Sequence, residues 1–193
     1  CNLERVVLPR EFSLKEIDEV KNSTNVELEV FIHGALCVCY SGQCYLSASV
    51  GGRSANRGEC AQPCRKKFSV VAEDGKILAK PQYLLSMKDF SMAKHLKRLI
   101  EIGVDSLKIE GRLKDENYVK NVVSYYRNLI DSINPALRPS FGVIKTDFIP
   151  DINKTFNRGY TDFNAGGKCK NLINPKTPKF TGCLLYTSPS PRD

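Results

Sequence analysis

Five cysteines bunched in a glycine-rich stretch are the residues of this chain best suited to chemistry. They are Cys37, Cys39, Cys44, Cys60 and Cys64. Thiolates crowded into one loop repel each other unless a cation holds them, and the usual cation is a metal ion or an iron–sulfur cluster. Disulfide bonds in a secreted protein are the alternative. The three other cysteines, Cys1, Cys169 and Cys183, lie far from this group. Such uneven spacing favours a ligand site over a disulfide framework.

A second set of chemically capable residues follows the predicted strands at their carboxyl ends. The set contains Arg10, Glu11, His33, Lys88, Asp89, Glu110 and Arg112. In a β/α barrel this edge forms the catalytic face, and the cysteine loop leaves from the same edge after His33. We therefore predict that thiolates, carboxylates and arginines lie together at one mouth of the barrel, with Glu110 and Arg112 as catalytic candidates. The alternative is that Glu110 and Arg112 pair with each other or cap a helix, because ion pairs are common at such rims.

A cysteine or serine peptidase would need a nucleophile paired with a base. The chain has two histidines, His33 and His95, and neither a GxSxG nor an HExxH motif. We expect His95 to be solvent-exposed in the middle of a helix, and His33 to hydrogen-bond to backbone at a strand end. The residues therefore identify no nucleophile–base pair for proteolysis.

The elements that must position these residues alternate between strand and helix. The predicted strands are Arg5–Leu8, Val26–His33, Tyr83–Ser86 and Asp105–Ile109, and Phe68–Ala79 is predicted as a hairpin turning at Asp74 and Gly75. The predicted helices run from the Ser13/Glu16 capping box to Lys21, from Asp89 to Ile102 and from Glu116 to Ile133. This rhythm predicts about four parallel β/α units, in a barrel or an open sheet.

The charge of the chain favours an acidic partner. Its formal net charge is +8, and RNA or DNA is the natural candidate. The basic residues beside the cysteines are the candidate RNA contacts: Arg57, Arg65, Lys66 and Lys67. A non-catalytic module that binds RNA or a protein partner is a further hypothesis, which predicts no bound iron. No stretch approaches the roughly 20 apolar residues that a membrane span needs.

Both ends of the sequence look artificial. The chain opens at Cys1 without an initiator methionine, and residues 183–193 resemble the translation of a sequencing adapter. We therefore expect an internal fragment. Its predicted organisation is a partial β/α barrel at 1–138 with a cysteine-rich loop at 34–67, then the start of a small β-rich region at 139–182.

Several segments together resemble the peptidase U-32 family, also called collagenase-like proteases. The first is EVFIHGALCVCYSGQCYLS, from Glu29 to Ser47. It is followed in order by GRSANRGECAQPCR (52–65), YLLSMKD (83–89), GVDSLKIEGR (103–112) and FNRGYTD (156–162). The resemblance extends from Glu4 to Gly182. It implies the C-terminal part of a TIM-like α/β barrel without the first strands, followed by a short β-rich tail.

The resemblance also implies a function and a cofactor. Relatives include cytoplasmic proteins that hydroxylate a tRNA uridine, with prephenate as hydroxyl donor, or a cytidine of 23S rRNA, and they carry a [4Fe–4S] cluster. The ligands it implies here are Cys37, Cys44, Cys60 and Cys64, with Cys39 in reserve, because Ser91 stands where some relatives have the fourth cysteine. Zinc would accept the same four sulfurs, so the identity of the metal rests on the family. The family name also keeps a peptidase as an alternative.

Overall fold

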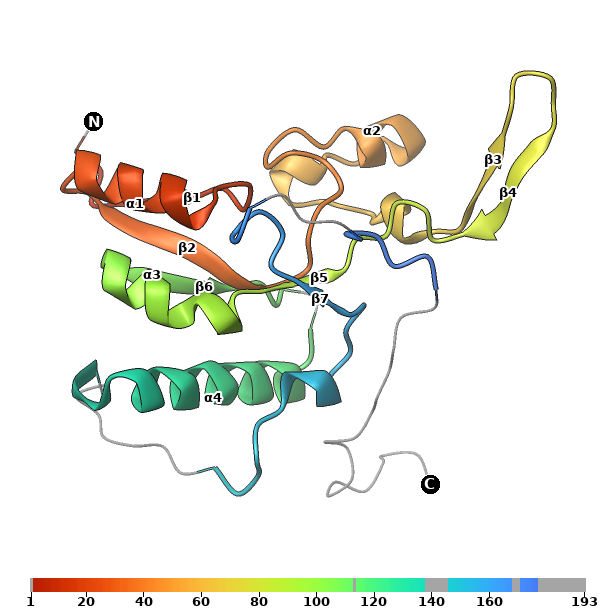
Figure 1. The fold of residues 1–193 in the computed structure, drawn as a ribbon. Helices are drawn as coiled ribbons and strands as arrows, with labels where there is room; N and C mark the ends of the chain where they lie inside the picture. Colours follow the sequence, from red (N-terminus) through yellow and green to blue (C-terminus); the bar gives the residue numbers. More distant parts are fainter. Residues whose placement is uncertain (1, 113, 138–145, 168–170, 177–193) are drawn as a thin grey trace.

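A computed structural model describes residues 2–112, 114–137, 146–167 and 171–176 (Figure 1). Its centre is a sheet with three parallel strands, β1 (Arg5–Leu8), β2 (Glu27–Gly34) and β6 (Ser106–Ile109). Strand β2 lies in the middle, because it pairs with both β1 and β6. The carboxyl ends of all three strands therefore point the same way, which is the arrangement that brings the residues after them to one edge.

Three helices accompany these strands. They are α1 (Leu14–Ser23), α3 (Leu96–Ile102) and α4 (Glu116–Ile133), and α3 packs between α1 and α4 (Figure 1). Helix α1 begins with the expected capping box, in which Ser13 and Glu16 satisfy each other's backbone N–H groups. The helix predicted for Glu116–Ile133 is confirmed over its full length.

The core lies between β2 and these helices. Along β2 the side chains of Leu28, Val30 and Ile32 are buried, and those of Glu29 and Phe31 between them are less so. They meet Leu99 of α3 and Val122 of α4, both fully buried. The other face of the sheet carries charge instead.

On that second face, Glu29 of β2 links the two neighbouring strands. Its carboxylate lies 2.7 Å from Lys108 Nζ of β6 and 3.7 Å from an Arg5 guanidinium nitrogen of β1. Arg10 and Lys108 both lie over the ring of Phe31. This face of the sheet is therefore tied together by ion pairs and cation–π contacts across the strands.

The prediction for residues 83–102 is partly wrong. Residues 83–86 form a turn, and the strand is instead β5 (Asp89–Ser91), placed where the helix was predicted to begin. Strand β5 runs antiparallel to the end of β2, through the pairs His33↔Ser91 and Gly34↔Phe90. A short 3-10 helix (Ala93–His95) then leads into α3. The α/β class with parallel strands is thus confirmed, but three parallel strands are seen where about four units were expected.

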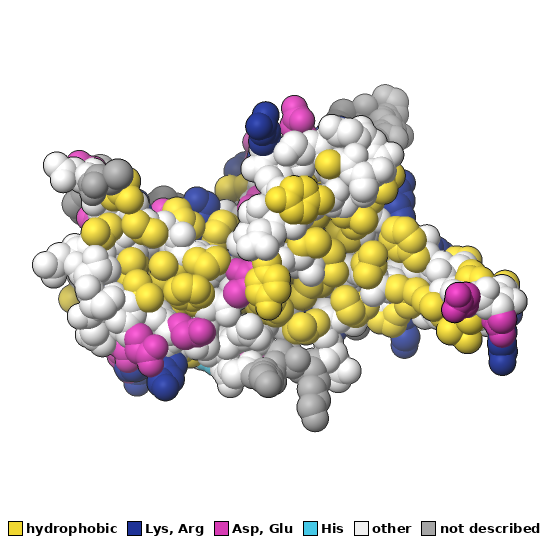
Figure 2. Space-filling view, turned by 90° about the horizontal axis from the view of Figure 1, so that it is seen from above, with side chains coloured by type: hydrophobic (Ala, Val, Ile, Leu, Met, Phe, Trp, Pro, Cys, Tyr) yellow, Lys and Arg dark blue, Asp and Glu magenta, His cyan; other side chains and the backbone are white. Residues whose placement is uncertain are grey.

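The described strands form an open sheet, so the TIM-like barrel stays a prediction. Between β2 and β5 the chain makes an excursion that carries the cysteines. It contains helix α2 (Leu46–Gly51), the 3-10 helices Ala55–Arg57 and Pro63–Arg65, and the hairpin of β3 (Phe68–Val71) and β4 (Ile77–Gln82). Figures 1 and 2 show the hairpin, which was predicted, projecting from the body with hydrophobic side chains exposed along it.

The tail after α4 returns to the same sheet. It has 3-10 helices at Pro135–Leu137 and Ile152–Lys154, and the two-residue strand β7 (Tyr160–Thr161) runs parallel to β5. Residues 183–193, interpreted as an adapter, lie outside the described residues, as do parts of the region 139–182. None of the helices in the described ranges combines the length and the apolarity needed to cross a bilayer.

Candidate metal centre

The five central cysteines are all free thiols and lie together beyond the carboxyl end of β2. The sulfurs of Cys37, Cys39 and Cys44 all lie within 4.8 Å of one another. Cys64 is the most buried of the five, and its pKa is raised, mainly by burial. The charges of Cys37, Cys60 and Cys44 raise it further, and that of Arg65 lowers it. One loop region therefore brings the predicted ligands Cys37, Cys44, Cys60 and Cys64 near each other, with Cys39 among them.

The protonation of these thiols depends on what else is present. Burial raises the pKa of Cys37 and, with nearby Cys44, raises the pKa of Cys39 to about 11. Both groups are therefore neutral thiols at pH 7 without a cation. A bound metal would deprotonate them, so metal binding would release protons.

Two hydrogen-bond donors lie near the sulfur of Cys60, one of the predicted ligands. The backbone N–H of Gln62 donates to its sulfur at 3.4 Å, and the Ser47 hydroxyl lies at 3.8 Å. Ser47 is itself fixed, because its oxygen accepts from the Ala61 N–H. Donors aimed at a sulfur stabilise its thiolate and fix its direction, as outer partners do around metal centres. The grouped cysteine sulfurs, with these hydrogen bonds to one of them, thus fit a thiolate-bound metal ion or cluster.

The catalytic candidates Glu110 and Arg112 lie at the same edge of the sheet. Glu110 follows β6, and its N–H donates to the carbonyl of His33 at 2.8 Å. Gly34 makes this approach possible, since a Cβ there would lie 2.5 Å from the Glu110 carbonyl oxygen. Arg112 extends to the cysteine loop, where a Cβ on Gly58 would lie 3.0 Å from its guanidinium. Neither residue is hydrogen-bonded to the other in the described part of the chain, and Arg112 is exposed.

The basic candidates separate into two kinds. Arg57, Lys66 and Lys67 are exposed. Arg65 is half-buried, and its guanidinium donates to the carbonyls of Met87 and Leu36 at 2.6 and 2.5 Å and to a serine hydroxyl. Burial also lowers the pKa of Arg65. The guanidinium of Arg65 therefore joins the cysteine loop to the body of the protein.

The histidines bear on the peptidase hypothesis. His33 is buried, and its Nδ1 lies 3.2 Å from the Tyr126 hydroxyl. Burial, with a smaller effect of Lys114, lowers its pKa to about 4. The expectation that His95 is solvent-exposed is wrong, because its Nε2 lies 2.8 Å from an Asp162 carboxylate oxygen and the side chain is largely covered. Within the described residues, neither histidine is hydrogen-bonded to a cysteine.

Two further polar groups lie near this edge: Asp89, which was among the residues expected there, and Lys114, which the sequence did not reveal. Asp89 is buried and accepts from both the backbone and the guanidinium of Arg158. Lys114 lies over the rings of Tyr118 and Phe156, and burial lowers its pKa. The segment FNRGYTD drew attention to Phe156 and Arg158, but nothing in the sequence indicated that Arg158 pairs with Asp89 or that Lys114 lies over Phe156.

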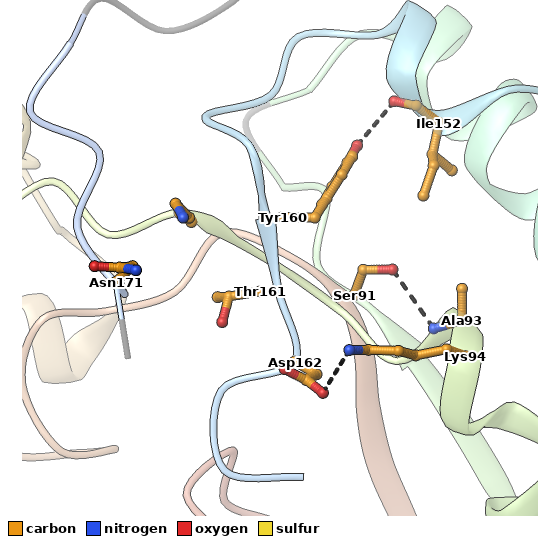
Figure 3. Close-up of a pocket in the computed structure, with 9 residues that line it drawn as sticks. Ser91, Ala93, Lys94, Ile152, Tyr160, Thr161, Asp162 and Asn171 are labelled. Atoms are coloured by element: carbon orange, nitrogen blue, oxygen red, sulfur yellow. Dashed lines mark hydrogen bonds and ion pairs between the residues drawn. The ribbon is translucent and has the colours of Figure 1, made fainter. Parts of the chain in front are cut away.

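A small cavity lies on the tail side of β5 (Figure 3). Its volume is about 310 Å³, and its lining includes Ser91, Lys94, Tyr160 and Asp162. Lys94 and Asp162 form an ion pair at 2.9 Å across it. Ser91, the position where some relatives were expected to have a ligand, is buried and lies 3.2 Å from the Tyr126 hydroxyl.

Comparison with known proteins adds to this geometry. The family model described as Peptidase family U32 matches residues 1–173. The chain is 43% identical to a 23S rRNA 5-hydroxycytidine synthase of Escherichia coli over 92% of its length, which is 28% of that relative. It is 41% identical to tRNA hydroxylation protein P1 of Bacillus subtilis over 81% of its length, or 38% of that relative.

Another relative is named for proteolysis. A collagenase of Porphyromonas gingivalis is 32% identical over 81% of the chain, or 41% of that relative. The chain thus spans well under half the length of these three curated relatives. No solved structure matches it.

Proposed function

The chain belongs to peptidase family U32, and from that premise we propose that the protein is an iron–sulfur-dependent enzyme that hydroxylates a nucleobase in tRNA or rRNA. The single observation that carries the proposal is the similarity to the E. coli rRNA synthase, which covers 92% of this chain. The tRNA hydroxylation protein of B. subtilis supports the same substrate class. Because this chain spans only part of these relatives, the activity belongs to the full-length protein.

The proposed cluster ligands are Cys37, Cys44, Cys60 and Cys64. Two features support them: the thiols gather at one strand-end loop, and the sulfur of Cys60 already receives hydrogen bonds. A [4Fe–4S] cluster held there would supply redox and Lewis-acid chemistry at the mouth. Prephenate is the hydroxyl donor that we propose from the family resemblance.

Glu110 and Arg112 are proposed to hold the donor or the base. Arg112 is exposed and lies against the cysteine loop, so its guanidinium is available for a bidentate contact with a carboxylate or phosphate. Phosphate contacts are assigned to Arg57, Lys66 and Lys67, because all three are exposed beside the cysteines. Arg65 is instead given a structural role, since its guanidinium donates to backbone carbonyls.

The proposed architecture is the C-terminal part of a TIM-like barrel. The consecutive parallel strands β1, β2 and β6 and the helices between them support it. Residues after the carboxyl ends of these strands would then form the active-site mouth, as in other barrels of this class.

Proteolysis is the rival function. The name of the P. gingivalis relative favours it, and Cys37 would be the candidate nucleophile. His33, however, is buried with its Nδ1 3.2 Å from the Tyr126 hydroxyl, and in the described part of the chain it has no hydrogen bond to a cysteine. Replacing Cys60 separates the two hypotheses, because Cys60 is a ligand in the cluster proposal and has no role in a cysteine–histidine peptidase.

The test uses the full-length protein, purified without oxygen, and cells that lack the gene. We expect about four irons per chain, and we expect Cys60→Ala to lose both the iron and the hydroxylated nucleotide measured by mass spectrometry of cellular RNA. Ser49→Ala, in the nearby helix α2, is the matched control and keeps both. A Cys60→Ala protein that has no iron but still hydroxylates RNA would refute the cluster mechanism.

A further inference from the structure

The cysteine loop contains five thiols, one more than a four-ligand cluster uses. Cys39 is the additional thiol, and it does not lie apart from the others. Its sulfur is within 4.8 Å of those of Cys37 and Cys44. In the described part of the chain, this is the one group of three or more cysteine, histidine or carboxylate side chains whose donor atoms all lie that close.

The spacing of these three sulfurs suits a single ion. With Zn–S bonds of about 2.3 Å, two sulfurs on one tetrahedral ion are roughly 3.8 Å apart. Sulfurs within 4.8 Å therefore need to move by only about 1 Å to bind one zinc ion. A cube binds each cysteine through a different iron, which holds the sulfurs farther apart than one ion does. The trio is thus closer to a single-ion site than to three corners of a cube.

The loop that brings the three sulfurs together is fixed by its own hydrogen bonds. A turn between Cys39 and Cys44 is closed by the Gln43 N–H donating to the Tyr40 carbonyl at 3.1 Å. The N–H of Ser41 donates to Glu11 after β1, and the N–H of Cys44 donates to the Asn56 side chain. These contacts reach outside the turn, so they hold it in place relative to β1 and to the rest of the loop.

We propose that Cys37, Cys39 and Cys44 form a second metal site, which binds one thiophilic divalent ion, Zn²⁺, with three thiolates and one further ligand. This site shares Cys37 and Cys44 with the proposed cluster. The loop therefore holds either one zinc ion or one cluster. The zinc site is argued from its own geometry. The mutual exclusion of zinc and cluster rests on the proposed function.

Two serine variants separate the two ligand sets. Cys39→Ser removes a ligand of the zinc site alone, and Cys60→Ser removes a ligand of the cluster alone. Metal-free full-length protein is titrated with Co²⁺, whose thiolate charge-transfer absorption reports the sulfurs bound, and with Zn²⁺ in competition with a chromophoric chelator. Circular dichroism confirms folding, and Cys39→Ala serves as a second variant at this position.

We expect Cys39→Ser to weaken Zn²⁺ binding at least about tenfold and to lose about a third of the cobalt–thiolate absorption, since two thiolates remain of three. Cys60→Ser keeps wild-type Zn²⁺ affinity within about twofold. Equal affinity in Cys39→Ser and wild type, or an equal loss in both variants, would overturn the zinc site.

The exclusion is tested by reconstituting iron and sulfide into protein preloaded with Zn²⁺. We expect wild type to take up little iron, and Cys39→Ser to take up about four irons per chain under the same conditions. Four irons in zinc-loaded wild type would overturn the exclusion. If no protein takes up iron while Zn²⁺ still binds through Cys39, the cluster proposal fails and the zinc site stands.

Discussion

His33 makes the stability of this protein depend on pH in a way that can be calculated. The pKa of the buried imidazole is lowered to about 4, against 6.5 for an unperturbed histidine. Between these values the imidazole takes up a proton in the unfolded chain but not in the folded protein. The contribution of His33 to the free energy of unfolding is therefore present in full above pH 6.5 and is lost as the pH falls toward 4. Lowering the pH from 7 to 5 should therefore cost about 2 kcal/mol through His33 alone.

The perturbation that isolates this effect is His33→Gln, which removes the titration but keeps a polar partner for the Tyr126 hydroxyl. The free energy of unfolding is measured by urea denaturation at pH 7 and pH 5 for metal-free protein. We expect the variant to lose about 2 kcal/mol less than wild type between the two values, whatever its stability at pH 7. His95→Gln removes the other imidazole and should keep the contribution of His33. Equal losses in wild type and His33→Gln would refute the reasoning that His33 is buried in its neutral form.

Two substitutions test the contacts that build the site. Arg65→Ala removes a guanidinium that donates to two backbone carbonyls and a hydroxyl, so we expect a loss of about 3 kcal/mol in urea denaturation, whereas Arg57→Ala stays within about 0.5 kcal/mol of wild type. Equal effects would contradict the structural role of Arg65. Gly34→Ala places a Cβ 2.5 Å from the Glu110 carbonyl oxygen at a φ of +122°, and we expect it to cost more than about 3 kcal/mol or to prevent soluble expression. Gly51→Ala, whose Cβ meets no atom within 4 Å, is the control; a stable Gly34→Ala protein would show that β2 and the residues after β6 can separate.

Local patterns predicted helices α1 and α4 and the hairpin of β3 and β4 well. The capping residues of α1 and the apolar periodicity of α4 act within a few residues, so their positions could be read from the sequence. The hairpin of β3 and β4 follows from the Asp74–Gly75 turn, where Gly75 has a φ of +82°. The α/β class followed from the same alternation of elements.

The structure of the parts that were predicted wrongly or missed depends on contacts between segments that are far apart in the sequence. Residues 89–91 directly precede a helical apolar pattern and were therefore assigned to that helix. Their backbone instead pairs with the end of β2, a distant segment whose position no local pattern reports. The same limit applies to His95, whose partner Asp162 lies 67 residues away. In the site, the grouping of the cysteines could be predicted, since they are close in sequence. The involvement of Cys39 in a compact trio could not, because it depends on the turn at Tyr40–Gln43.

The direct pairing of β2 with β5 has a consequence for how the cysteine loop can evolve. The excursion between β2 and β5 begins and ends at neighbouring strands, so closing it costs chain entropy that grows only with the logarithm of its length. Doubling such a segment adds only about 0.6 kcal/mol. Insertions, deletions or an extra cysteine between Leu36 and the hairpin are therefore cheap as long as the sheet beneath is kept. Selection can thus change the number and kind of metal ligands here while the scaffold stays the same.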